Sequence, residues 1–435
     1  MPVRISLSDT RLIGAVLAVA FLIVIAAFVK KQPTSWNDIS HVAAIQSLVE
    51  RGTWVIDGSP WAQQTVDKVL INGQFYSDKM PLLSFLGAGV YALLRTQGMS
   101  LAPDCAATTG RCGYYWLTLI IMGLPAALLV ALFWSFARVH APLWAALAGT
   151  LALATGTMVT PYTVVFNHHL PGAVGLFASF YIITMGKQQN PRWIAAAGLL
   201  AALAPAFDGS SGIVALGVAA MAVGRYRKDF IYFALGAAAP VIATVLIDCF
   251  MVHTFLPPYL VAGGYDYPGA AAATSAAGLS SSDNLYNYAF RIFVGAQGVF
   301  AYNPLLLFAL AGAVRVAVQP RRPLHAAAVA TLVSFVVLGV YLALNTGNYG
   351  GEAYGLRFFV PVIPIAMAFI LFVPPLSGIT WRSSPALIAA PLLALSLFST
   401  YQGARRPWLY TPPPVHLARL DEPPFVGIKW EVKLW

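Results

Sequence analysis

Hydrophobic and polar positions alternate along this chain in long blocks, a pattern typical of helices that cross a membrane. Apolar runs of about 20 residues, the length that spans the hydrocarbon core of a bilayer, are separated by short polar segments. The first run follows a short basic segment. The apolar runs lie at residues 12–29, 113–137, 141–160, 170–186, 192–207, 210–224, 229–254, 293–315, 324–345, 356–374 and 385–400. The pattern predicts an all-α, polytopic integral membrane protein with about eleven transmembrane helices.

The polar segment after the first run, residues 30–112, is long and rich in charge. Within it, residues 38–50 place apolar side chains at helical spacing between polar ones, and this stretch is too short and too polar to cross a bilayer. An amphipathic helix on the outer membrane surface is therefore expected. Residues 53–56 and 69–76 are expected to be extended around the turn Asn72-Gly73. The apolar residues 81–94 are expected to form a second interfacial helix.

Basic residues determine the expected orientation of the chain. If residues 81–94 lie at the interface, nearly every cluster of Lys and Arg falls in loops on one side, which is the cytoplasmic side by the positive-inside rule. Almost all acidic residues, the segment 30–112 and a tail at residues 401–435 then lie outside. We expect a transmembrane domain at residues 1–400 whose outer face carries the chemistry, followed by this outer tail.

Composition agrees with the membrane class and excludes others. Of the 435 residues, 59% are hydrophobic and 10% charged, against about 25% charged in soluble domains. The net charge of +10 is explained by cytoplasmic Lys and Arg, so no nucleic-acid partner is expected. The sequence has no glycine-rich phosphate loop, no internal repeat and no Cys and His pairs at metal-ligand spacing, so neither a cofactor nor a metal is expected.

Cysteine usage adds one structural expectation. Cys105 and Cys112 lie in the outer segment, at a spacing that can close a small disulfide if the compartment is oxidising. Cys249 lies inside an apolar run and is expected to be a small core residue.

Two polar groups of the first outer segment are candidates for chemistry. Asn37 and Asp38 stand where the first helix leaves the membrane, where either can cap the following helix and Asp38 can also be a catalytic base. Lys79, next to Asp78 and just before Pro81, can place an ammonium at headgroup depth, where it would meet a lipid phosphate. The alternative is a lysine that merely lies at the headgroup boundary.

Later segments bring further polar groups to the outer ends of apolar runs. His168 and His169 head one run and can donate hydrogen bonds, move a proton or bind a metal, although neighbours on a helix point in different directions and chelate poorly. Asp208 is expected in a tight turn, and the alternative is a polar group that faces an outer cavity. Glu352 and Arg357 precede another run; an arginine at that depth is costly unless it is paired or used, and its planar fork suits a phosphate.

These segments, in this order, resemble the polyprenyl-phosphate-sugar-dependent glycosyltransferases of the GT-C superfamily. The resemblance rests on an acidic residue after the first helix, the Tyr-x-x-Lys-x-Pro segment at residues 76–81, an Asn-His at residues 167–168 and the Tyr-Gly-x-Arg segment at residues 354–357. The chain is most similar to bacterial members related to protein O-mannosyltransferases and the lipid A aminoarabinose transferases, and is thus like glycosyltransferase family 39. The resemblance covers most of residues 1–375.

The resemblance implies roles for individual residues. Such enzymes use an acidic residue of the first outer loop as general base. Many members have Asp-Glu where this chain has Asn37-Asp38, and because Asn37 cannot be a base, the role falls to Asp38 or Asp78. Lys79 and Arg357 would hold the phosphate of the donor, which is the leaving group. The residues expected to orient substrates are Asn37, Tyr76, His168, His169, Glu352 and Tyr354.

The expected activity is transfer of a sugar from a polyprenyl phosphate, with inversion, to an acceptor on the periplasmic or external face of the bacterial inner membrane. The implied partners are the lipid-linked donor, the bilayer and an acceptor that is a protein, a lipid or a glycan. A transporter or flippase of a lipid-linked or anionic substrate would also explain basic groups at headgroup depth. Against it stand the lack of repeats and the near absence of ionisable residues within the apolar runs. A purely structural subunit would leave the outer acids unexplained.

Overall fold

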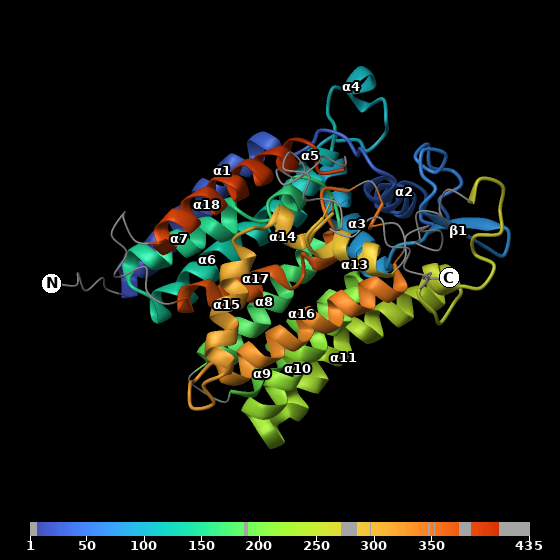
Figure 1. The fold of residues 1–435 in the computed structure, drawn as a ribbon. Coiled ribbons are helices and arrows are strands. Elements are labelled where there is room, and N and C mark those ends of the chain that lie inside the picture. Colours follow the sequence, from blue (N-terminus) through green and yellow to red (C-terminus); the bar gives the residue numbers. More distant parts are fainter. Residues whose placement is uncertain are drawn as a thin grey trace.

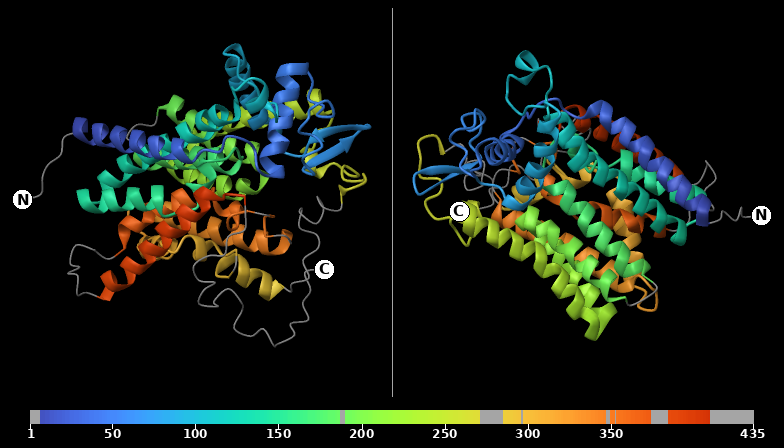
Figure 2. Two further views of the ribbon diagram at one scale, coloured as in Figure 1. Left: turned by 90° about the horizontal axis from the view of Figure 1, so that it is seen from above. Right: turned by 180° about the vertical axis from the view of Figure 1, so that it is seen from behind.

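A bundle of packed helices forms the body of the protein (Figures 1 and 2). The computed structural model describes residues 7–186, 190–270, 285–295, 297–346, 349–351, 353–373 and 384–408. The longer helices of the bundle are α1 (Leu7–Phe28), α6 (Leu124–His140), α7 (Leu143–Thr155), α8 (His169–Met185), α9 (Pro191–Phe207), α10 (Gly212–Tyr226), α11 (Phe230–Ile247), α15 (Leu306–Ala317), α16 (His325–Asn345) and α18 (Ser384–Arg405).

Shorter elements connect these helices. The short helices are α4 (Cys105–Thr108), α5 (Tyr114–Thr118), α13 (Leu285–Phe293), α14 (Val299–Tyr302) and α17 (Ile363–Met367). Single turns of other helical types are η1 (Leu119–Gly123), η2 (Pro161–Thr163), η3 (Gly209–Ser211), η4 (Arg227–Asp229), η5 (Asp248–Val252), η6 (Pro258–Leu260), η7 (Arg357–Phe359) and η8 (Ala368–Phe372).

Length and hydropathy identify the helices that can cross a membrane. Within the described chain, four stretches are long and apolar enough: Asp9–Phe28, Tyr114–His140, Gly209–Val252 and His325–Asn345. Several other apolar helices are shorter. Large apolar side chains are exposed on the outside of the bundle, among them Leu12 and Ile23 of α1 and Leu235 of α11, as expected of surfaces that lipid covers. The all-α, polytopic class is confirmed, and the number of eleven spans stays a prediction.

One expected span is divided. Residues 293–315 were expected to form a single helix, but α13 ends at Phe293, α14 ends at Tyr302 and α15 begins at Leu306. Pro304 explains the second break, since proline has no backbone N–H to donate and disfavours helical geometry in the residue before it. That residue, Asn303, leaves the helical region, and its side-chain Oδ1 accepts a hydrogen bond from the Met158 backbone N at 2.7 Å.

Small residues allow α9 and α11 to pack backbone against backbone. A Cβ added at Gly198 of α9 would lie 1.9 Å from the Phe233 carbonyl oxygen, and one at Gly236 of α11 would lie 1.9 Å from the Ala195 carbonyl oxygen. Such close approach is typical of helices that associate inside a membrane, where dispersion contacts replace the hydrophobic effect.

Residues 30–112, the segment expected outside the membrane and here called the first outer segment, contain two longer helices and a hairpin besides the short helix α4. These are α2 (Trp36–Arg51), the antiparallel strands β1 (Lys68–Ile71) and β2 (Gln74–Ser77), and α3 (Pro81–Thr96). The hairpin turn at Asn72 and Gly73 has positive φ at both residues, 52° and 79°, as a two-residue turn of this kind requires. The expected turn is thus confirmed. Residues 53–56 form no strand, although the Ile56 backbone N donates to the Phe75 carbonyl.

Burial of α2 differs from the expectation. The helix was expected to lie on the membrane surface, but its residues 37–47 are buried within the protein. The loop and hairpin cover the polar side of α2: Ser40 Oγ lies 2.7 Å from Ser77 Oγ, and Thr65 donates to the Trp36 carbonyl at 2.9 Å. The polar residues between the apolar positions therefore bind protein rather than water or lipid headgroups.

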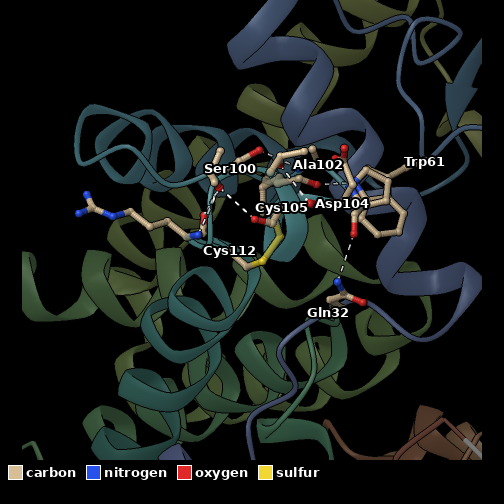
Figure 3. The surroundings of a disulfide bond; sticks show 12 residues. Gln32, Trp61, Ser100, Ala102, Asp104, Cys105 and Cys112 are labelled. Atoms are coloured by element: carbon tan, nitrogen blue, oxygen red, sulfur yellow. Dashed lines mark hydrogen bonds between the residues drawn. A yellow bond between two sulfur atoms is a disulfide. The ribbon is translucent and has the colours of Figure 1, made fainter.

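A disulfide closes a small loop beside α2 (Figure 3). Cys105 and Cys112 are bonded, with their Cα atoms 5.3 Å apart. The Ser100 backbone N donates to the Arg111 carbonyl at 2.9 Å, and the indole of Trp61 donates to the Leu101 carbonyl at 2.6 Å. The first bond joins the two ends of the loop, and the second attaches the loop to the rest of the first outer segment.

Arginine side chains bind backbone carbonyls at one end of the bundle. In Figure 1 the N-terminus lies at one end, and α2, α3 and β1 lie at the other. Helix α8 begins near α2 and ends at Met185, where Arg225 donates to the Gly186 carbonyl at 3.1 Å. Arg315 likewise donates to the Phe372 carbonyl, at the end of η8. These basic residues thus lie at the end of the bundle opposite the first outer segment.

Candidate functional site

A cavity of about 1020 Å³ opens at the end of the bundle that carries the first outer segment. The segment before α2, the end of the hairpin, the start of α8, the end of α9 and the segment at η7 enclose it. Its volume is at the upper end of the range of small-molecule sites. The ionisable and polar residues that line it include Asn37, Asp67, Asp78, Lys79, His168, Asp208, Tyr265, Arg357 and Trp408.

Lys79 is held between two carboxylates at the cavity wall. Its Nζ lies 2.6 Å from Asp67 Oδ2 and 3.0 Å from Asp78 Oδ1, and Tyr265 OH donates to Asp78 Oδ2 at 3.2 Å. Burial acts to lower the pKa of Lys79, but the two carboxylates outweigh it and hold the pKa above its ordinary value. Burial also raises the pKa of Asp78 to about 6, although the Lys79 ammonium acts to lower it.

Arg357 supplies a second cation to the same cavity. Its guanidinium lies over the rings of Trp408, at 5.2 Å, and Phe358, at 5.6 Å, in the arrangement of a cation–π contact. Among the described residues no carboxylate pairs with it, and its Nε has no hydrogen-bond partner. Its charge acts to lower the pKa of Lys79, so the two cations lie within electrostatic range of one another.

Asp38 does not line the cavity. Its carboxylate accepts hydrogen bonds from the backbone N of Ser35 at 2.8 Å and of Thr34 at 3.1 Å, from Tyr114 OH at 2.8 Å and from the Trp408 indole at 3.2 Å. The bond to Ser35 completes a capping box at the start of α2. Burial raises the pKa of Asp38 to about 7, and the hydrogen bonds act to lower it. The N-cap residue is Ser35 rather than Asn37 or Asp38, and Asp38 contributes to the cap from the third position of the helix with its carboxylate fully engaged.

Asn37 faces the cavity instead. The side chain is 1% exposed, and within the described chain neither its amide oxygen nor its amide nitrogen has a hydrogen-bond partner. An unpaired buried amide costs about 1–3 kcal/mol. The side chain therefore offers one donor group and one acceptor to whatever fills the cavity.

Three buried histidines lie at the cavity wall, and of these His168 lines the cavity while His41 and His169 lie behind it. His41 Nε2 lies 3.2 Å from His168 Nδ1, and His169 Nδ1 lies 2.7 Å from Asp208 Oδ2. Burial lowers the pKa of His41 and of His168 well below the ordinary value, and the charges of neighbouring groups, including Lys79, lower both further. Both effects favour the neutral form of the imidazoles of His41 and His168.

Two of these histidines, His168 and His169, form with Asp208 the one described cluster that could hold a metal ion. Ligand atoms of His168, His169 and Asp208 lie within 4.8 Å of one another, a set of nitrogen and oxygen donors that suits transition metals. The two imidazoles were expected to point in different directions, but their ring centroids lie 4.2 Å apart, and their Nδ1 atoms have different partners. An ion would have to replace the bond between His169 and Asp208. Sequence reasoning missed this cluster because Asp208 is 39 residues from His169.

Other expected site residues lie away from the cavity. Tyr76 OH donates to Gln74 Oε1 at 3.2 Å, and Tyr354 OH lies 2.6 Å from Ser399 Oγ; both tyrosines are buried and neither lines the cavity. Asp208 lines the cavity and also accepts a hydrogen bond from the Ser210 backbone N, as expected of a turn. Glu352 lies outside the described residues.

Sequence reasoning did not single out Asp67, Tyr265 or Trp408. Trp408 reaches the site from beyond the end of α18, and its indole bonds to Asp38, 370 residues earlier. Nothing in the sequence around a tryptophan in a connecting segment predicts that it contacts a site so far away in the chain. Asp67 is one of several acids in the first outer segment, and only the fold brings it to Lys79.

No protein-family model and no curated protein sequence matches this chain. Among solved structures, ArnT from Cupriavidus metallidurans bound to undecaprenyl phosphate is similar, with a TM-score of 0.54, 14% identity and 87% of this chain aligned to 63% of that one. The archaeal oligosaccharyltransferase AglB from Archaeoglobus fulgidus, in complex with an inhibitory peptide and a dolichol-phosphate, aligns with a TM-score of 0.47, 13% identity and 91% of this chain on 56% of that one.

The likeness to ArnT shows the fold. The chain has the GT-C fold, as the sequence resemblance implies. It spans about six-tenths of the length of the solved structures it matches.

Proposed function

We propose that this protein is a glycosyltransferase that moves a sugar from a polyprenyl phosphate to an acceptor at the outer face of the membrane, with inversion at C1. The observation that carries the proposal is the presence of two cations, Lys79 and Arg357, on one cavity at the end of a membrane bundle with the GT-C fold. The solved ArnT structure of that fold holds undecaprenyl phosphate.

Lys79 and Arg357 would bind the phosphate that leaves with the lipid. The phosphate gains negative charge as its bond to C1 breaks, and fixed cations in a cavity stabilise that charge without rearranging. Arg357 is suited to this role because its fork is held on Trp408 and Phe358 by stacking and has no described carboxylate partner.

Asp78 is the base in this proposal. Unlike Asp38, it lines the cavity, and its Oδ2 contacts only Tyr265 OH among the described residues. With a pKa of about 6, the carboxylate is mostly ionised at neutral pH yet basic enough to accept a proton. Oδ2 would take the proton of the acceptor hydroxyl or amine while the acceptor atom bonds to C1. The bond from C1 to the phosphate oxygen breaks, and its electron pair leaves with the phosphate.

Mass spectrometry of polyprenyl-linked sugars tests the function. Cells that lack this chain should accumulate a polyprenyl phosphate sugar, whose mass identifies the donor, and complementation with the wild type should remove it. Complementation with Asp78→Asn should not, whereas Asp104→Asn, in the disulfide loop, should act as the wild type does. A lipid that changes only its leaflet, with Asp78→Asn fully active, would favour a flippase.

A further inference from the structure

We infer that His168 donates a hydrogen bond from its Nε2–H to the phosphate in the cavity, and that Ser84, acting through His41, fixes the tautomer in which it can do so. The inference rests on the proposed function and deepens it, because it assigns a neutral third contact to the anion between the two cations. Ser84 and His41 are positioning residues in this scheme, since neither lines the cavity.

The three side chains come from separate elements and form one chain of hydrogen bonds. Ser84 on α3 places its Oγ 2.7 Å from His41 Nδ1, and His41 on α2 places its Nε2 3.2 Å from His168 Nδ1. Ser84 and His41 are buried, at 1% and 0% exposure. Only His168, just before α8, reaches the cavity.

The hydroxyl of Ser84 determines which atoms donate and which accept in this series of hydrogen bonds. Among the described residues its only hydrogen-bond partner is His41. If the hydroxyl accepted a proton from His41, its own buried proton would have no acceptor, which carries a desolvation penalty. Ser84 therefore donates to His41 Nδ1.

The remaining protons follow, because a neutral imidazole has one donor and one acceptor nitrogen. With Nδ1 accepting, the proton of His41 is on Nε2 and is donated to His168 Nδ1. The proton of His168 is then on Nε2, the ring nitrogen that does not contact His41 and can bind a ligand in the cavity. In this tautomer His168 has no free acceptor nitrogen, so it cannot be the base.

The charges around His168 are consistent with a neutral donor. Lys79 and Arg357 act on its imidazole, and both disfavour a further positive charge there. An anion between these cations would meet two charged groups and one directional N–H. Phosphate, with several acceptor oxygens, has the geometry to accept all three.

Binding of phosphate probes to the purified full-length protein, with a chelator present, tests the contact. We expect His168→Ala to weaken binding of farnesyl phosphate about 10- to 100-fold, the effect of losing a hydrogen bond to a charged group. His168→Gln, whose amide can still donate, should recover much of the loss. Inorganic phosphate should compete with farnesyl phosphate if the site binds the phosphate group alone. Failure to compete would show that the lipid phosphate is required.

The tautomer has a spectroscopic test that a purely structural role would not affect. With ¹⁵N-histidine labelling, His168 should show a protonated Nε2 in the wild type, and Ser84→Ala should shift it toward a mixture of tautomers and weaken farnesyl phosphate binding. The matched control is Ser179→Ala on α8, because Ser179 is buried and has no hydrogen-bond partner in the described chain.

The outcomes separate the two proposals. Farnesyl phosphate binding by the wild type, weakened in His168→Ala and Ser84→Ala but not in Ser179→Ala, supports the inference. Unchanged affinity in His168→Ala, or a protonated Nδ1 on His168 in the wild type, overturns the inference and leaves the transferase standing. A wild type that binds no lipid phosphate overturns both.

Discussion

At the scale of single residues, the neighbours Asp38 and Asn37 lie in different surroundings. Asp38 turns inward to accept four hydrogen bonds, whereas Asn37 faces the cavity with its amide unpaired. The chemistry of the site therefore depends on side-chain direction, which sequence order does not specify. Acids that line the cavity, such as Asp78, become the candidates for proton transfer.

Activity should depend on the ionisation of Asp78. Because burial raises its pKa to about 6, the base is protonated and inactive below that pH and ionised above it. We expect kcat/KM to fall as pH decreases through about 6, roughly tenfold for each further pH unit. A pH profile of sugar transfer, measured where the protein stays folded, checks this. A profile that is flat from pH 5 to 8 would contradict the assignment of Asp78.

Asp38 should matter for stability rather than for the chemical step. In Asp38→Asn, an NH₂ group would replace a carboxylate oxygen that accepts hydrogen bonds. The new N–H groups would then face other hydrogen-bond donors at the cap of α2. We expect a loss of about 1–3 kcal/mol in the free energy of unfolding. Thermal unfolding in detergent measures this, and Asp104→Asn is the comparison because the Asp104 side chain is exposed and makes no hydrogen bond to the helix that follows it. Loss of transfer in a fully stable Asp38→Asn protein would instead make Asp38 the base.

At the scale of elements, the apolar blocks predict helices well because helix formation in a membrane depends on local composition. The first run, residues 12–29, matches α1, and residues 324–345 match α16. The burial of α2 could not be predicted in the same way. An amphipathic pattern indicates that one side of the helix is in apolar and the other in polar surroundings. The pattern is the same whether the polar side contacts lipid headgroups or, as in α2, a covering loop.

The contact between α9 and α11 provides a stability prediction. In Gly198→Ala the new Cβ would meet the Phe233 carbonyl at 1.9 Å, so the helices must separate and lose dispersion contacts along their length. The melting temperature should fall clearly. Gly224→Ala on α10 is the matched control, since nothing lies within 4 Å of an added Cβ there; it should be neutral or slightly stabilising. Equal melting temperatures for the two variants would contradict the packing.

At the scale of the whole molecule, the site is assembled from segments that are far apart in the sequence. The residues on the cavity come from the first outer segment, the start of α8, the end of α9, η7 and the segment after α18. Sequence order could identify Lys79 and Arg357 as cations at the outer ends of apolar runs. It could not show that Trp408 lies between Arg357 and Asp38, because that contact depends on how every intervening helix packs.

The orientation of the molecule can be tested with exposed cysteines at its two ends. Thr108 lies in the disulfide loop at the cavity end, and Lys228 lies between α10 and α11 at the basic end; both are exposed. Since basic loops stay in the cytoplasm, Thr108→Cys should react with a membrane-impermeant maleimide in intact spheroplasts. Lys228→Cys should react only after permeabilisation, with the wild type giving the background from Cys249. The reverse pattern would place the cavity in the cytoplasm, where a small disulfide would not persist and the proposed outer acceptor could not be reached.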